Sequence, residues 1–174
     1  MQFVRKAGNL YVEGWNQWLG LKRYQLPTPR VKTETHSPGG GIMDLDIPLG
    51  SIEPLTLEFD TLNASPDLLG SFGMHLSHRK LWTIYELLQD EKSGTKRERI
   101  ITGRGIVGEN TPEEMAGRGV KGYGHVIKSI TDYEDVIEGY GIVARFSFFT
   151  NSWSGYGISA GSEDDNRILR INGG

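Results

Sequence analysis

Two short stretches of the chain alternate apolar with acidic or polar residues one by one, and this pattern constrains the fold more than any other feature. They are residues 43–47 and residues 55–60. Side chains of a β-strand point alternately to its two faces, so each stretch has one apolar face and one wetted face. The sequence therefore predicts antiparallel sheet with a core on one side and water on the other.

The same alternation assigns individual side chains to the two faces. The apolar residues expected to fill the core are Met43, Leu45, Ile47, Leu55, Leu57 and Phe59. The acidic residues expected on the wetted face are Asp44, Asp46, Glu58 and Asp60. A surface lined with like charge repels a polyanion, which gives these four residues a use that is not catalytic.

Composition narrows the class of protein. The 174 residues suit a single domain with its own core, and the 24 glycines and seven prolines favour strands and turns. A net charge of −3 argues against a nucleic-acid binder held by phosphate contacts, and the lack of cysteine excludes disulfides and thiolate chemistry. No apolar run approaches the ~20 residues of a membrane span, and no secretory signal is visible. We therefore expect folding in a cytoplasm without membrane insertion.

Turn residues divide the rest of the chain into short elements. The expected strands form a strand–turn–strand unit over residues 9–18, a hairpin from residues 80–89 and 97–106, and a pair from residues 126–132 and 142–150.

Two short helices are also expected. Ser65 and Pro66 are suited to a helix start, and residues 111–114 match a capping box. The acidic residues 163–165 are read as a polar tail, and residues 167–171 as a last strand or a loose end.

A long polar segment interrupts the strand pattern after Pro29. It alternates weakly, has almost no apolar face, and ends in a glycine-rich tip; its residues are Val31, Lys32, Thr33, Glu34, Thr35, His36, Ser37, Pro38, Gly39, Gly40 and Gly41. Such an arm, over about residues 28–43, cannot hold itself against a core. It is either a flexible loop or half of a hairpin that another chain organises, and unpaired arms are natural sites for pairing between chains.

Motifs for chemistry are weak throughout, and we expect no enzyme, no cofactor and no metal. Asp44 and Asp46 lack the glycine and the distal glutamate of a calcium loop, and His75 and His78 lack further zinc ligands nearby in the sequence. Residues 103–108 match G-x-G-x-x-G as a bare string, but no long helix can follow. We interpret them as a strand with small residues at a bulge or close contact.

The order of these features resembles the major tail tube proteins of contractile-tailed bacteriophages. The resemblance covers roughly residues 9–153 and rests on an order of features, without one sharp motif. These are Asn9-Leu10-Tyr11-Val12-Glu13-Gly14, residues 26–34 leading into Gly39-Gly40-Gly41, the strands at 44–47 and 53–58, Pro66-Asp67-Leu68-Leu69 with Phe72-Gly73, Gly103-Arg104-Gly105-Ile106, Lys121-Gly122, and residues 130–139 before a last strand.

The resemblance implies a mainly β fold: a β-sandwich or half-barrel of two packed antiparallel sheets with a short flanking helix and a long hairpin arm. It implies hexameric rings that stack into a hollow tube inside a contractile sheath, with double-stranded DNA passing through without specific binding. Implied partners are further copies of the chain, the sheath protein, and baseplate and terminator proteins, in a virion tail assembled in the host cytoplasm. The four acidic residues would face the bore, and the arm at 31–41 would lie between subunits.

The sequence departs from that pattern in two places and leaves alternatives open. The loop at 109–124 carries an extra Pro112-Glu113-Glu114-Met115 turn, and the variable tail, about residues 154–174, is longer than expected. One alternative to a phage tail is the tube of a DNA-free bacteriocin-like particle. Another is a β-sandwich carbohydrate-binding module whose stacking platforms would be Trp15, Trp18, Trp82 or Trp153. A hydrolase has no support from residue spacing.

Overall fold

The computed structural model describes residues 3–73, 76–158 and 163–171, and these form a mainly β protein, as predicted. The strands are β1 (Phe3–Val12), β2 (Trp15–Asn16), β3 (Leu21–Gln25), β4 (Val31–His36), β5 (Leu45–Ile52), β6 (Leu57–Thr61), β7 (Lys80–Asp90), β8 (Lys96–Pro112), β9 (Tyr123–Ile137), β10 (Gly141–Ser147) and β11 (Ser152–Gly155). The helical elements are α1 (Pro66–Gly70), the 3-10 turn η1 (Leu76–His78) and α2 (Glu163–Leu169).

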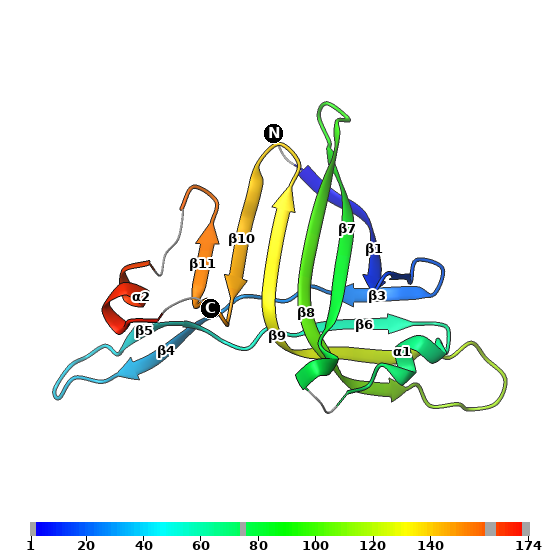
Figure 1. The fold of residues 1–174 in the computed structure, drawn as a ribbon, viewed down its shortest axis with the longest axis horizontal. Coiled ribbons are helices and arrows are strands. Elements are labelled where there is room, and N and C mark those ends of the chain that lie inside the picture. The colour runs from blue at the N-terminus through cyan, green and yellow to red at the C-terminus, as the bar shows by residue number, and fades with distance from the viewer. Residues whose placement is uncertain (1–2, 74–75, 159–162, 172–174) are drawn as a thin grey trace.

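Seven strands form the main sheet, in the order β11-β10-β9-β8-β7-β1-β2 (Figure 1). Its neighbours are antiparallel, and the predicted hairpins are present as β7–β8 and β9–β10. The same hydrogen-bonded network continues through β6 and β3, so these two strands and the main sheet make nine strands in all. A separate sheet contains only β4 and β5.

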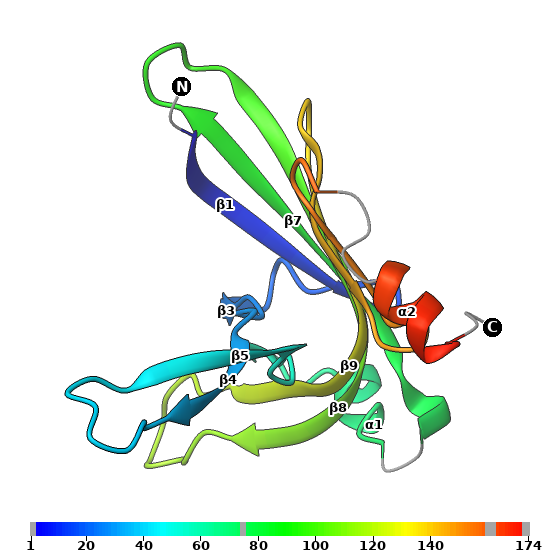
Figure 2. The ribbon, with the colours of Figure 1, turned by 90° about the vertical axis from the view of Figure 1, so that its left-hand side faces the viewer.

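The two layers of the fold share their longest strands, β8 and β9. Both strands bend, and Figure 2 shows β3, β6 and the bent ends of β8 and β9 forming a layer against one face of the main sheet. The bend coincides with bulges at Arg104/Ile106 and Val107/Glu109 and with a positive φ of 52° at Ser129. We call the covered face of the main sheet the inner face and the opposite one the outer face.

The core lies between these layers. Its fully buried members include Leu10, Val12, Leu57, Phe59, Leu68, Trp82, Ile84, Ile101, Val107 and Ile127. The predicted alternation of β6 is confirmed, because Leu57 and Phe59 are buried while Glu58 and Asp60 lie on the other face at intermediate exposure.

The G-x-G-x-x-G string lies in β8, where two of its glycines allow close packing. A Cβ at Gly103 would lie 2.4 Å from Cζ2 of Trp82, and one at Gly105 would lie 2.5 Å from Cγ2 of Ile127. Since both neighbours are core side chains, only glycine leaves room for them. The interpretation as a close-packed strand is confirmed.

The other alternating stretch was placed wrongly. Met43, Leu45 and Ile47 do not fill the core: their side chains are 75%, 59% and 44% exposed. Leu45 and Ile47 lie on β5, which pairs only with β4 and has no second layer over it. Periodicity identified the strand, but burial also requires a facing layer, which the two-stranded hairpin lacks.

Two further expectations, the helix at residues 111–114 and the irregular or extended C-terminal tail, are wrong. No helix starts at the capping-box residues, because Thr111 and Pro112 continue β8 opposite Gly124 and Tyr123 of β9. The tail forms α2 instead of a strand or a loose end. Its three acidic residues lie in the first helical turn, where negative charge interacts favourably with the helix dipole and stabilises the helix.

Candidate functional site

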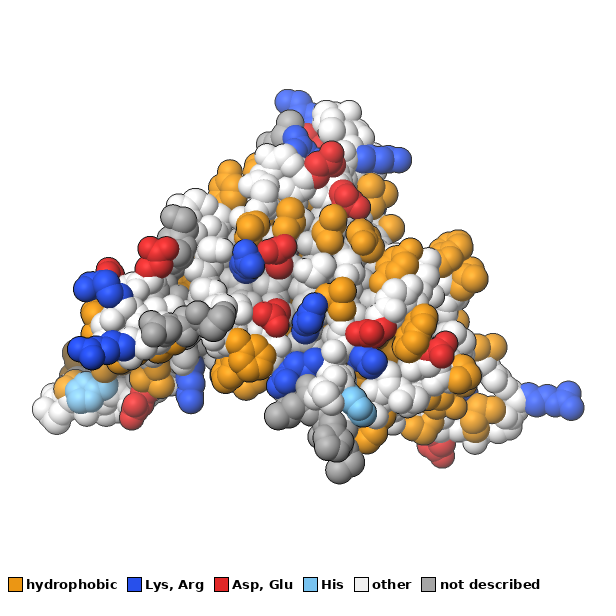
Figure 3. All heavy atoms as spheres, viewed as in Figure 1, with side chains coloured by type: hydrophobic (Ala, Val, Ile, Leu, Met, Phe, Trp, Pro, Cys, Tyr) orange, Lys and Arg blue, Asp and Glu red, His pale blue; other side chains and the backbone are white. Residues whose placement is uncertain are grey.

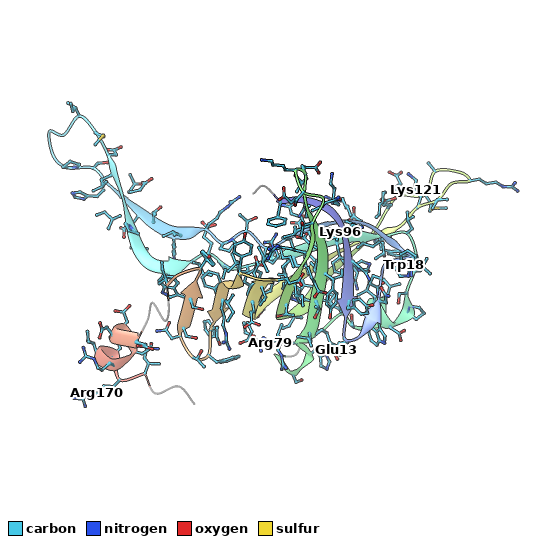
Figure 4. The ribbon with its side chains drawn as sticks, turned by 90° about the horizontal axis from the view of Figure 1, so that it is seen from above. Glu13, Trp18, Arg79, Lys96, Lys121 and Arg170 are labelled. Atoms are coloured by element: carbon cyan, nitrogen blue, oxygen red, sulfur yellow. The ribbon has the colours of Figure 1, made fainter. Side chains whose placement is uncertain are left out.

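The β4–β5 hairpin, which we call the arm, is exposed along almost its whole length. Opposite residues share a face, so Thr35 and Asp46 lie on one face while the pairs Glu34–Ile47 and His36–Leu45 lie on the other. Thr35 Oγ1 donates a hydrogen bond to Asp46 Oδ1 at 2.7 Å. The arm projects away from the two layers (Figures 1 and 4), as a surface suited to contact with another molecule would.

Apolar side chains are unusually exposed along the arm. Their exposed fractions are 59% for Val31, 106% for Ile42, 75% for Met43, 59% for Leu45, 44% for Ile47 and 47% for Leu49. A row of large apolar side chains in water is unfavourable by ~25 cal/mol per Å², so contact with a further surface would stabilise it. The sequence indicated the polar half of this arm, while its apolar half was assigned to the core.

A cluster of charged side chains anchors β3, the strand that leads into the arm. Glu86 is buried and accepts hydrogen bonds from Tyr24 Oη at 2.7 Å, Arg5 Nη1 at 3.1 Å and Arg99 Nη1 at 3.1 Å. Arg99 also forms a two-pronged pair with Asp135, at 2.9 Å and 2.5 Å. Two carboxylates thus face two guanidinium groups, which offsets the desolvation of each charge.

Burial and pairing shift the pKa values in this cluster. Burial, and then the hydrogen bond to Glu86, raise the pKa of the Tyr24 hydroxyl. The hydrogen bond to Asp135 raises the pKa of Arg99, which is therefore charged throughout the accessible range. Sequence reasoning missed this cluster. The signal was present as charged residues at inward positions of apolar strands, but only the strand register brings them together.

The four predicted acidic residues do not form one surface. Glu58 and Asp60 lie together on the outward side of β6, where Asp60 pairs with Arg23 of β3 and raises the pKa of that guanidinium. Asp46 lies on the arm, and Asp44 immediately precedes β5. The alternation assigned each pair to a wetted face, but the pairs belong to different sheets.

Both ends of the main sheet carry open strand edges. Among the described residues, β10 is the one strand that pairs with β11 at one end, and Gly155 of β11 also bridges to Ile158. At the other end most of β1 pairs, within the described ranges, only with β7, because the short β2 covers just Tyr11 and Val12. Open edges leave backbone groups available for pairing with another chain.

Large apolar side chains are exposed near both edges. Near β11 they are Phe148, Phe149, Trp153 and Tyr156, and near β2 they are Trp15, Trp18 and Leu19. Figure 3 shows hydrophobic side chains gathered at the right-hand end of the outer face. Open backbone and exposed apolar area at both ends would suit head-to-tail contact between copies.

The tryptophans proposed as carbohydrate platforms are divided between core and surface. Trp82 is fully buried, and Trp15, Trp18 and Trp153 are 37%, 63% and 38% exposed. Of these, Trp18 lines an open groove of about 570 Å³ together with Tyr85, Leu87 and Glu98. The tryptophans therefore do not form a single platform.

Within the described ranges, the structure shows no group of three or more His, Asp or Glu side chains placed to hold a metal ion. His78 lies in η1, and His75 lies outside the described residues. His125 is buried, with Nδ1 2.7 Å from Asn110 Oδ1 and Nε2 3.1 Å from Thr61 Oγ1. Among the described residues, no helix is long and apolar enough to cross a membrane.

A protein-family model matches most of the chain. The model of the family described as phage tail tube protein FII matches residues 5–144, which include most of β1, all of β2 to β9 and most of β10. No curated protein matches the chain. The matched range contains the arm, the charged cluster and the acidic face of β6, and it excludes β11 and α2.

Proposed function

The chain belongs to the phage tail tube protein FII family, and from this premise we propose that it forms hexameric rings that stack into the tube of a contractile tail. Membership makes the protein a structural component of a virion tail. In the proposed assembly the tube conducts double-stranded DNA toward the host without binding it specifically. A contractile sheath surrounds the tube, which contacts baseplate and terminator proteins at its ends, and assembly takes place in the host cytoplasm.

One observation carries this proposal: the family model covers residues 5–144, most of the chain. The open edges of β1 and β11 at opposite ends of one sheet support the ring. A contact between two different surfaces repeats from copy to copy, and it closes into a ring when the rotation permits. Pairing between edges would join the sheets of neighbouring copies and would cover the exposed apolar side chains beside them.

The arm is proposed to lie between subunits, with residues 31–41 in contact with a neighbouring copy. Its support is exposure: every residue of β4, and all of β5 except Ile52, is exposed in the single chain. The two strands of the arm are held together at their root, where Glu53 N donates to Arg30 O at 2.8 Å. Because its two strands are joined at the root and its side chains are exposed, the hairpin can contact a neighbour while its own domain stays folded.

The bore is proposed to be lined by acidic side chains, which would repel DNA and keep it mobile. Glu58 and Asp60 suit this role, since both lie on the uncovered side of β6. Asp44 and Asp46 lie on the arm, so their predicted place in the bore requires that the arm itself reach the bore.

Negative-stain electron microscopy of the purified protein, together with light scattering over a range of concentrations, tests this function. We expect rings or tubes that grow with concentration. A protein that stays monomeric at high concentration would contradict the proposal.

A further inference from the structure

We infer that the tip of the arm of one copy docks on the 113–122 loop of an adjacent copy. This inference rests on the proposed self-assembly and names the two segments that meet. The loop joins β8 to β9. The segment that we call the arm tip is residues 42–46, the end of the β4–β5 connection and the first two residues of β5.

The base of the 113–122 loop is fixed by Glu113. This carboxylate accepts hydrogen bonds from Lys22 Nζ at 2.7 Å and from Gly122 N at 3.2 Å, and Glu113 N donates to Gly122 O at 2.9 Å. The pair with Lys22, and then the bond from Gly122, lower the pKa of Glu113, so the clamp is charged at neutral pH. Gly122 allows a close approach to β6, because a Cβ there would lie 1.9 Å from the carbonyl oxygen of Thr61.

Beyond this clamp the loop presents positive charge and apolar area. Met115 and Val120 are 63% and 77% exposed, and Arg118 and Lys121 are exposed beside them. Lys121 lies near the root of the loop (Figure 4). Lys121 also helps to lower the pKa of Glu113, but that carboxylate is already paired with Lys22. Residues 114–121 themselves carry two cations and one carboxylate, that of Glu114.

The arm tip has the complementary composition. Ile42, Met43 and Leu45 are highly exposed, and Asp44 and Asp46 alternate with them. Apolar side chains on both segments would be removed from water by contact, and carboxylates would meet a guanidinium and an ammonium group. This contact places Asp44 and Asp46 between subunits and leaves Glu58 and Asp60 for the bore.

The positions of the two segments allow them to meet between copies. They lie at opposite ends of the long axis (Figure 1), and both project on the inner side of the main sheet (Figures 2 and 4). A shift of one copy along the long axis therefore brings its arm tip toward the loop of the next copy. Within one chain the two tips are too far apart for this contact.

The other acidic and apolar segment, α2, fits the loop less well. Its first turn carries Glu163, Asp164 and Asp165, and Ile168 and Leu169 are exposed. However, α2 projects on the outer side of the main sheet, away from the 113–122 loop (Figures 2 and 4). The same shift would leave α2 and the loop on different sides of the sheet, so the arm tip is the better partner.

Charge reversal tests this contact. Asp44→Lys and Lys121→Glu, each alone, place like charges at the interface, and we expect the critical concentration for polymerisation to rise by about tenfold. An equimolar mixture of the two variants should polymerise at nearly the wild-type concentration, because the reversed arm of one variant then meets the reversed loop of the other with opposite charges. Glu163→Lys, with the same charge change on α2, is the matched control and should leave the critical concentration unchanged.

Cross-linking gives an independent measure of the same contact. The chain has no cysteine, so Met43→Cys and Val120→Cys introduce single thiols. When the two variants, distinguished by a size tag, are mixed, assembled and oxidised, we expect a disulfide-linked dimer of mixed size.

The outcomes separate this inference from the proposed function. Wild-type protein that assembles while both reversals have no effect and no mixed dimer forms would overturn the contact alone. Wild-type protein that never assembles would overturn both. Assembly that fails in each variant and returns in the mixture supports both.

Discussion

The Tyr24 hydroxyl donates a hydrogen bond to Oε1 of Glu86 at 2.7 Å, and this bond joins β3 to the middle of β7. Gly8 makes room for it, because a Cβ at Gly8 would lie 1.8 Å from the Tyr24 hydroxyl oxygen. Tyr24 is the second-to-last residue of β3, and the chain then runs through Pro27 into the arm. The bond therefore fixes the strand from which the arm projects.

We predict that Tyr24→Phe destabilises the fold by about 2 kcal/mol, because a buried carboxylate loses one charge-assisted donor. Gly8→Ala should destabilise it further, since the new methyl group displaces the tyrosine ring. Urea unfolding monitored by tryptophan fluorescence measures both changes.

A double-mutant cycle separates the two effects. Combined with Tyr24→Phe, Gly8→Ala should be less destabilising than it is alone, because the closest clash involves the missing hydroxyl. Strict additivity of the two free-energy changes would show that Gly8 and Tyr24 do not interact.

The sequence predicted the core strands better than it predicted the charged cluster, for a physical reason. Alternation along β6 reports burial directly, because Leu57 and Phe59 are both turned toward the inner face of the main sheet. The pairing of Glu86, Arg99 and Asp135 depends on the register of three strands, which no single stretch of sequence contains. Charged residues at inward positions of β7, β8 and β9 are the signal that could have revealed it.

The arm shows the opposite limit. Residues 43–47 have the same alternation as β6, yet they lie exposed on a two-stranded hairpin. Alternation reveals that a strand has an apolar face, while the partner that covers this face can belong to another molecule. In a protein that assembles, the same alternation of apolar and polar residues can therefore mark a strand of the core or a strand at an interface between subunits.

We predict that acidification weakens the fold through His125. Burial lowers the pKa of His125 to about 4 from an ordinary value of 6.5, and Asp60 offsets only part of this shift. Between these values the unfolded chain binds a proton that the folded chain does not, so stability decreases as pH falls below 6.5. The expected loss between pH 6.5 and pH 5 is on the order of 1 to 2 kcal/mol from this residue.

Unfolding free energies measured over this pH range, for wild type and for His125→Gln, test the prediction. The lowered pKa values of Asp90, Glu109 and Glu113 act in the same direction, but at a pH below their ordinary values of 3.8, 4.5 and 4.5. The variant should therefore show a flatter dependence above pH 5. Parallel curves for the two proteins would assign the acid sensitivity to other groups.

Removal of the arm should separate folding from assembly. We predict that deletion of residues 33–40 leaves a folded monomer that no longer forms tubes, because β4 contributes no residue to the core. Circular dichroism and thermal unfolding measure the fold, and light scattering measures assembly. Loss of cooperative unfolding in the shortened protein would place the arm within the folded core.

Reversal of charge on β6 tests the acidic bore. We predict that Glu58→Lys leaves tube formation intact and slows DNA ejection, because an ammonium group in the bore attracts phosphate. The delay should be larger at low ionic strength, where attraction between exposed charges is less screened. Glu58→Gln is the matched control: it removes the carboxylate without adding a cation, so its delay should be smaller. Virions carrying each variant can be followed by the rate of DNA release, and a rate equal to the wild type in both would place Glu58 outside the bore.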